Sequence, residues 1–171
     1  MKRIELVVDT DVASFIHNRS ERGLAYIDLI AGSCAGITVQ SVAEFRAGVV
    51  KRNWGPRKIE SLHEFLTHFL LIEASSEIAN ISGAVYACCA RVGRALSWPD
   101  AWAAATALWL DVPLVAHDWD FEGIPGLQIL TVHQNWQVRE EGSVLSESEP
   151  LWLGERGADP ATLRSGAILT S

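Results

Sequence analysis

The sequence predicts a single α/β domain built on a parallel β-sheet, and three observations support this fold class. Short apolar runs rich in β-branched residues alternate along the chain with helical patterns, as in proteins whose parallel strands are joined by helical crossovers. One such run opens the stretch Ile4–Phe15 and is apolar at nearly every position, which is typical of a strand covered on both faces. The run Trp98–Leu110 is apolar almost all round, which predicts a central, buried helix.

In the first part of the chain we expect three short helices around a second strand. Ser14–Arg19 and Leu24–Ala31 are helix-compatible runs separated by the polar residues SERG. Gly36–Val39 is a short run with β-branched residues, and we predict it to be the second strand. Ser41–Val50 is predicted to be a helix. We expect it to end before the NWGP sequence at Asn53–Pro56, which is a strong signal for the end of a helix.

The next part of the chain continues the alternation of helices and strands. Arg57–His68 carries apolar residues at helical spacing, and the apolar run Phe69–Ile72 after it is predicted to be the third strand. Glu77–Val92 is a longer helical pattern with its apolar residues on one side. We predict the fourth strand at Pro113–Ala116, since proline is tolerated at the first position of a strand, and the fifth at Gln128–Val132.

We predict one domain at residues 1–133 and a C-terminal extension, partly linker-like, at residues 134–171. A chain of 171 residues has about the length of one domain. The extension contains the polar and acidic run REEGSVLSESEP, followed by an isolated apolar cluster, Leu151–Leu153. We therefore expect the tail from Arg139 onward to be dispensable for the fold.

The composition disfavours several classes of protein. We see neither a signal peptide nor an apolar run long enough to span a membrane, so we expect a cytoplasmic protein with no membrane partner. The three cysteines do not have the spacing of a zinc site. The net charge of −7 argues against a general nucleic-acid binder, although the segment between Phe45 and Ile59 holds five basic residues and no acid.

Four acidic residues fall where the predicted strands end or the following helices begin. Asp9 ends the first strand, Asp118 follows the fourth, and Glu44 and Asp100 lie in the first turns of predicted helices. In a parallel sheet these positions open on the same edge, where ligands of α/β proteins bind. We therefore expect the four carboxylates to converge on one cleft.

Each acid also has a local explanation that needs no ligand. Ser41 and Glu44 have the spacing of a capping box, and Asp11 would serve as an N-cap for the first helix. Asp118 and Asp120 are typical turn residues. Taken together, however, converging carboxylates repel one another unless a cation compensates their charge. Mg²⁺ or Mn²⁺ prefers such oxygen ligands and activates water for phosphodiester hydrolysis, which makes a metal-dependent nuclease the favoured interpretation.

These residues lie in stretches that resemble the PIN-domain family, and specifically the VapC-type toxin ribonucleases of bacterial toxin–antitoxin pairs. The similar stretches are VVDTDVASF, TVQSVAEFRAG and PDAWAAATALWLDVPLVAHDWDFEGIPGL, which cover most of Ile4–Val132 in the family's order. The resemblance implies a PIN-like three-layer α/β fold with a five-stranded parallel sheet flanked by helices. It also implies a Mg²⁺- or Mn²⁺-dependent endoribonuclease that forms homodimers and is blocked by a cognate antitoxin protein.

The resemblance assigns roles to individual residues of this chain. It implies that Asp9, Glu44, Asp100 and Asp118 are the catalytic and metal-binding acids. Residues implied to support the site are Asp11, Ser14 and Asp120. Because acids alone cannot position RNA, we also predict that basic residues hold its phosphates, namely Arg46, Lys51, Arg52 and Arg57.

The sequence departs from the family at Ala116, where a threonine is usual just before the fourth acid. A threonine hydroxyl there would orient a carboxylate, so the sequence predicts a working but loosened metal site.

Two other functions stay open at this point. Asp9-Thr10-Asp11 also resembles the DxD motif of haloacid-dehalogenase-type phosphatases, but that family needs a lysine late in the chain and the last one here is Lys58. A non-catalytic PIN fold that binds RNA or a protein partner is the other alternative.

Overall fold

Five parallel strands form one sheet, and the computed structural model describes them within residues 3–133. The strand order is β3-β2-β1-β4-β5, with β1 in the middle. The strands are β1 (Leu6–Val8), β2 (Ala35–Thr38), β3 (Leu70–Ile72), β4 (Leu114–Val115) and β5 (Ile129–Leu130). The predicted five-stranded parallel sheet is therefore confirmed. The predicted extension at 134–171, including the Leu151–Leu153 cluster and the expected dispensable tail, lies outside the described residues.

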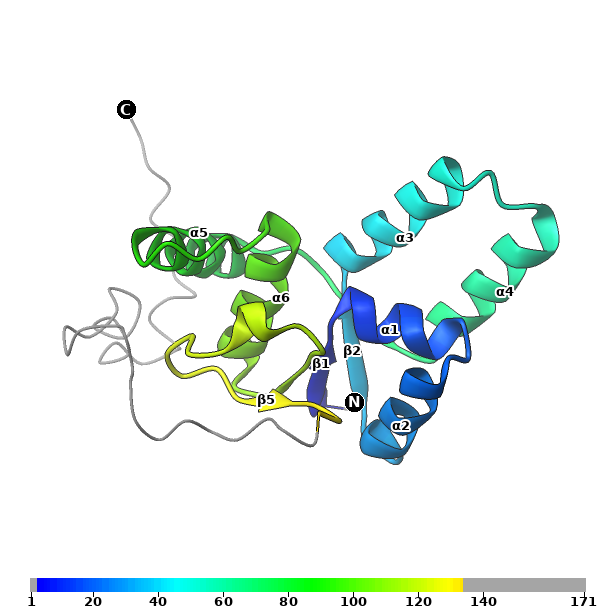
Figure 1. Cartoon of the computed structure of the whole chain (residues 1–171), viewed down its shortest axis with the longest axis horizontal. Helices are drawn as coiled ribbons and strands as arrows, with labels where there is room; N and C mark the ends of the chain where they lie inside the picture. Colours follow the sequence, from blue (N-terminus) through cyan, green and yellow to red (C-terminus); the bar gives the residue numbers. More distant parts are fainter. Residues whose placement is uncertain (1–2, 134–171) are drawn as a thin grey trace.

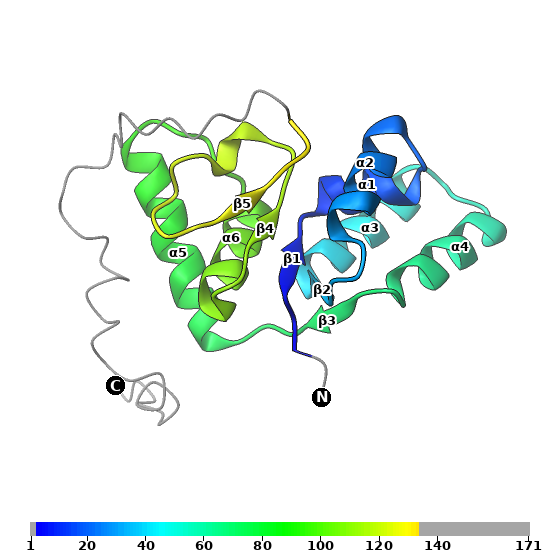
Figure 2. The ribbon, with the colours of Figure 1, turned by 90° about the horizontal axis from the view of Figure 1, so that it is seen from below.

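Helices cover both faces of this sheet, which gives the predicted three layers (Figures 1 and 2). The α-helices are α1 (Thr10–His17), α2 (Glu21–Ile30), α3 (Val39–Lys51), α4 (Pro56–Leu66), α5 (Ser76–Arg91) and α6 (Trp98–Leu110), and a short 3-10 helix η1 spans Trp119–Phe121. Helices α1 to α4 lie on one side of the sheet, and α5 and α6 on the other. Within the described part of the chain, no helix is both long and apolar enough to cross a membrane.

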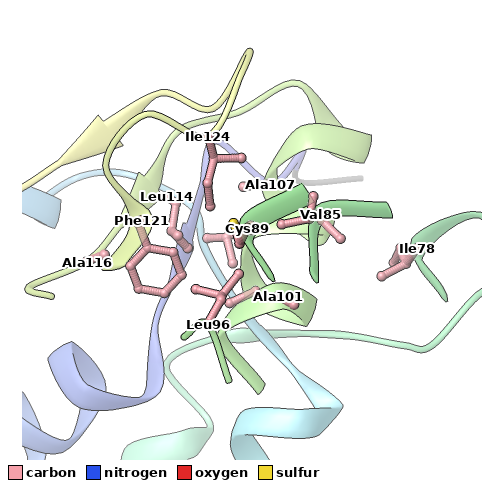
Figure 3. Close-up of a cluster of buried hydrophobic side chains, with 14 of the residues drawn as sticks. Ile78, Val85, Cys89, Leu96, Ala101, Ala107, Leu114, Ala116, Phe121 and Ile124 are labelled. Carbon is pink, nitrogen blue, oxygen red and sulfur yellow. The ribbon is translucent and has the colours of Figure 1, made fainter. Parts of the chain in front are cut away.

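The central strand contributes to a separate apolar core on each face. Leu6 and Val8 are buried against the side of α1 to α4, whereas Val7 is buried against α5 and α6. The alternation follows from the two-residue period of a strand, which turns successive side chains to opposite faces. The α5–α6 core is built on five buried alanines of α6, and Figure 3 shows Ala101 and Phe121 within it. Small side chains bring α6 close to the sheet.

Three of the predicted helix starts were wrong, those of α1, α2 and α3, and side-chain capping explains them. Ser20 caps α2 by accepting from the Gly23 N–H at 3.1 Å, so this helix begins at Glu21, three residues earlier than predicted. Asp9, not Asp11, is the N-cap of α1: its carboxylate accepts a hydrogen bond from the Asp11 backbone N–H at 3.4 Å. Thr38, not Ser41, caps α3, because its hydroxyl accepts from the Ser41 N–H at 3.0 Å. Helix α1 therefore begins four residues earlier than predicted, and the expected capping box of Glu44 does not exist. At the starts of α1 and α3, the preceding strand passes into the helix without a loop.

Candidate active site

The four predicted acids lie on elements that meet at the carboxyl edge of the central strands. Asp9 directly follows β1, and its backbone N–H donates to the Val115 carbonyl of β4 at 3.0 Å. Asp118 comes after β4 and is the N-cap of η1, where its carboxylate accepts from the Asp120 N–H at 3.3 Å. Glu44 lies in the second turn of α3, the helix that follows β2, and Asp100 lies in the first turn of α6.

Asp9 is the buried member of this group, with 4% of its surface exposed. Burial raises the pKa of its carboxyl from 3.8 to about 7, and the negative charges of Asp100 and Asp11 add to the effect. The backbone hydrogen bonds that it accepts at the start of α1 oppose this shift only in part. Asp9 therefore keeps its proton to a much higher pH than an ordinary aspartate when no cation is nearby.

A threonine hydroxyl holds Glu44. The Thr10 side chain, from the first residue of α1, donates to the Glu44 carboxylate at 2.5 Å. Burial raises the pKa of Glu44, the bond from Thr10 lowers it, and the charges of Asp100 and Asp11 raise it further. The hydroxyl thus favours the charged form of a carboxylate that its surroundings would otherwise protonate.

A serine hydroxyl holds Asp100 in the same way. Ser97 caps α6 by accepting from the Asp100 N–H at 3.2 Å, and its own hydroxyl donates to the Asp100 carboxylate at 2.5 Å. Burial is the main cause of the raised pKa of Asp100, the bonds from Ser97 lower it, and the Asp11 and Asp118 charges raise it.

Mutual repulsion shows that the acids share one region. The charge of Asp11 raises the pKa of three of them, Asp9, Glu44 and Asp100, and that of Asp118 raises the pKa of Asp100. Asp11 itself is exposed at the rim. Asp120 is also exposed, and its charge acts on the thiol of Cys89, whose pKa is raised mainly by burial.

The donor chemistry of this cluster fits a hard divalent cation, because its groups are carboxylate oxygens whose charge is uncompensated. In residues 3–133, however, no three acidic, histidine or cysteine side chains stand together as a preformed ion site. Glu44 and Asp100 each accept a hydrogen bond through one carboxylate oxygen, from the Thr10 and Ser97 hydroxyls. Side-chain rotation would have to accompany the binding of an ion.

Two hydroxyls other than that of the predicted Ser14 are bonded to the acids. Ser14 lies one turn further along α1, and its Oγ accepts from the Asn18 side chain at 3.3 Å. Thr10 and Ser97 carry the hydroxyls that are bonded to the acids, and neither residue was predicted from the sequence to support the site. The signal was present, since each is next to or within three residues of a predicted acid.

The four predicted RNA-binding residues are all exposed but are not gathered at the acids. Arg46 follows Glu44 by two residues and therefore lies on the other side of α3. Lys51 is on the same side as Glu44, about 10 Å further along the helix axis. Arg52, the C-cap of α3, and Arg57, in the first turn of α4, lie at the far end of α3.

Comparison with known proteins identifies the family. A model of the PIN domain matches residues 6–127, which is more than half of the chain. The chain belongs to the PIN domain family. The resemblance seen in the sequence is thereby confirmed. No curated protein matches the sequence.

Solved structures share the fold of this PIN domain. It is similar to VapBC2 from Rickettsia felis, bound to a DNA fragment from its promoter, with a TM-score of 0.66 and 20% identity over 75% of this chain and 98% of that one. DNA-bound VapBC from Salmonella typhimurium gives a TM-score of 0.65 and 22% identity over 75% and 98%. FitAcB from Neisseria gonorrhoeae gives 0.60 and 21% over 74% and 96%.

Proposed function

We propose that this PIN domain is a metal-dependent endoribonuclease and the toxin of a toxin–antitoxin pair. The observation that carries the proposal is the shared carboxylate cluster, in which Asp9, Glu44 and Asp100 all have raised pKa values because of burial and the charges of neighbouring acids. Such a cluster is costly to the fold, and a bound cation would remove the cost. Membership of the PIN family excludes the haloacid-dehalogenase alternative.

In this proposal Asp9, Glu44, Asp100 and Asp118 hold one or two Mg²⁺ or Mn²⁺ ions. A bound ion would supply charge neutralisation and an activated water for hydrolysis of the phosphodiester bond, leaving a 5′-phosphate and a 3′-hydroxyl. The Thr10 and Ser97 hydroxyls keep the Glu44 and Asp100 carboxylates oriented and charged. Asp9, with a pKa of about 7, gives up a proton from its carboxyl as it becomes a ligand.

The proposed partners follow from the relatives. The structurally similar proteins include VapBC complexes, which supports a cognate antitoxin protein as a partner of this chain. We also propose a homodimer in the cytoplasm and an RNA substrate. Among the predicted phosphate contacts, Lys51 is the best placed because it shares the Glu44 side of α3.

One observation favours a second candidate, a PIN fold that binds RNA or a partner without cleaving it. No three acidic, histidine or cysteine side chains form a preformed ion site among residues 3–133. Incubation with single-stranded RNA and Mn²⁺ separates the two candidates. We expect cleavage with Mn²⁺ and none in EDTA or in Asp100→Asn. Cleavage that persists in EDTA would show that the metal mechanism is wrong, and binding without cleavage would establish the second candidate.

A further inference from the structure

Arg22 lies in the first turn of α2, next to helix α1 (Figure 1). Its guanidinium carbon stands 5.8 Å from the centroid of the Phe15 ring, over the face of that ring. The residue is exposed to solvent. An arginine that is held over an aromatic ring by its charge keeps N–H donors for a second partner. The contact therefore fixes a positive charge without neutralising it.

Phe15 joins this guanidinium to the end of β4. Phe15 follows Asp11 by four residues in α1, so the two side chains share one face of that helix. The Phe15 ring meets the His117 ring at 83°, with centroids 5.1 Å apart, and His117 directly precedes Asp118. Arg22 is thus one aromatic ring away from the two segments that carry Asp11 and Asp118.

The charges of Arg22 and of these two acids act on one side chain. The pKa of His117 is lowered by burial, by the neighbouring His133 and by Arg22, and it is raised by Asp11 and Asp118. Effects of this kind fall off over about 10 Å because water and ions screen them. Arg22 and the two acids therefore occupy the same rim of the carboxylate cluster.

Tyr26 holds α2, and with it Arg22, against this end of β4. Its buried hydroxyl donates to the Ala116 carbonyl at 3.0 Å and lies 2.9 Å from His117 Nδ1. Tyr26 is four residues after Arg22, on the same face of α2. Burial raises the pKa of Tyr26, the charge of Asp9 raises it further, and the charge of Arg22 lowers it. The backbone that carries Arg22 is therefore fixed beside the acids.

We infer that Arg22 binds a phosphate group of the RNA next to the phosphodiester bond that the carboxylate cluster cleaves. The carboxylates repel phosphates, and the basic residues predicted from the sequence are not gathered at them. An exposed arginine fixed at the rim supplies the missing positive charge, and its planar guanidinium can donate two parallel hydrogen bonds to one phosphate. The inference rests on the proposed function for its substrate, and it adds a substrate-binding residue from α2.

Arg46 provides a matched control. It is also an exposed arginine in a helix, but it lies on the side of α3 away from Glu44. Arg22→Ala and Arg46→Ala remove the same charge and the same donors, so they change the overall charge of the protein equally. A difference between them therefore reports on the position of Arg22.

The test measures RNA binding without cleavage. Full-length Asp100→Asn protein in EDTA is titrated into a fluorescent single-stranded oligoribonucleotide over a range of salt concentrations, alone and with each added substitution. We expect Arg22→Ala to raise the Kd about tenfold at low salt and to reduce the slope of log Kd against log salt by about 0.7. Arg46→Ala should change neither quantity. Arg22→Lys, which keeps the charge, should keep the slope and lose only part of the affinity.

Equal Kd values and salt slopes for Arg22→Ala and Arg46→Ala would overturn the inference. A loss of affinity that is the same in Arg22→Lys and Arg22→Ala, with the salt slope of the parent protein, would also overturn it, because Arg22 would then only cover Phe15. Normal RNA binding by Arg22→Ala together with loss of a protein partner would contradict the inference as well, and would assign Arg22 to a protein interface. RNA binding that depends on Arg22, without any cleavage by wild-type protein, would contradict only the proposed function.

Discussion

Asp9 and Asp118 follow neighbouring strands of the same sheet, yet one is buried and the other faces water. Asp9, the N-cap of α1, is 4% exposed, whereas Asp118, the N-cap of the short η1 helix, is exposed. Burial raises the pKa of Asp9 to about 7. Both carboxylates thus follow strands that end at the same edge of the sheet, and they differ in burial.

The largest expected effect is the change in folding stability when the charge of Asp9, but not that of Asp118, is removed. A pKa that rises from 3.8 to about 7 corresponds to a cost of up to about 4 kcal/mol for the charged form. Asp9→Asn should therefore raise the free energy of unfolding at pH 8 in EDTA by about 2–4 kcal/mol, as measured by urea denaturation. Asp118→Asn should change it by less than about 0.5 kcal/mol, because Asp118 is exposed. Similar effects of the two substitutions would remove the contrast.

The pH dependence of stability is the second way to test this contrast. Folded Asp9 keeps its proton to about pH 7, while the unfolded chain loses it near pH 3.8. The folded state therefore binds more protons in this window, and its stability in EDTA should fall as the pH rises from about 4 to 7 and then level off. Glu44 and Asp100 act in the same direction. Asp9→Asn should flatten the profile in part, and a wild-type stability that rises across this window would contradict the assignment.

Removal of the supporting hydroxyls should have a smaller effect, on metal affinity. Thr10→Val and Ser97→Ala delete the donors to Glu44 and Asp100, so both carboxylates lose orientation and part of the bias toward their charged forms. We expect each variant to bind Mn²⁺ about tenfold more weakly in calorimetric titration. Ser14→Ala is the control, because its hydroxyl is bonded to Asn18 rather than to an acid, and it should bind like wild type.

The smallest expected effect on metal affinity is that of Ala116→Thr. The family resemblance predicts that a hydroxyl here would tighten Mn²⁺ binding. The structure places the Ala116 methyl group in the apolar cluster that also holds Ala101 and Phe121, as Figure 3 shows. Added atoms in a packed core cost about 1–3 kcal/mol. We therefore expect a lower melting temperature with unchanged Mn²⁺ affinity, and tighter binding at an unchanged melting temperature would favour the loosened-site prediction.

Sequence patterns predicted the layers of this fold better than the contacts within its site. The limits of α6 were predicted to the residue, because Ser97 caps it and nearly all of its residues are apolar. The starts of α1 and α3 were missed, since a strand that passes directly into a helix leaves no turn signal. The positions of the acids followed from the end of each strand. The Thr10 and Ser97 hydroxyl bonds depend on side-chain rotamers, which no spacing rule specifies.

Calorimetric titration with Mn²⁺ tests the central claim most directly. Asp100 and Asp111 stand at opposite ends of α6, the first in the carboxylate cluster and the second at the C-cap in a left-handed conformation that asparagine tolerates. Asp111→Asn is therefore a matched control for Asp100→Asn. We predict that wild type and Asp111→Asn bind Mn²⁺ with the same affinity, and that Asp100→Asn binds it at least about tenfold more weakly. Equal binding by all three proteins would contradict the assignment of the carboxylate cluster as the metal site.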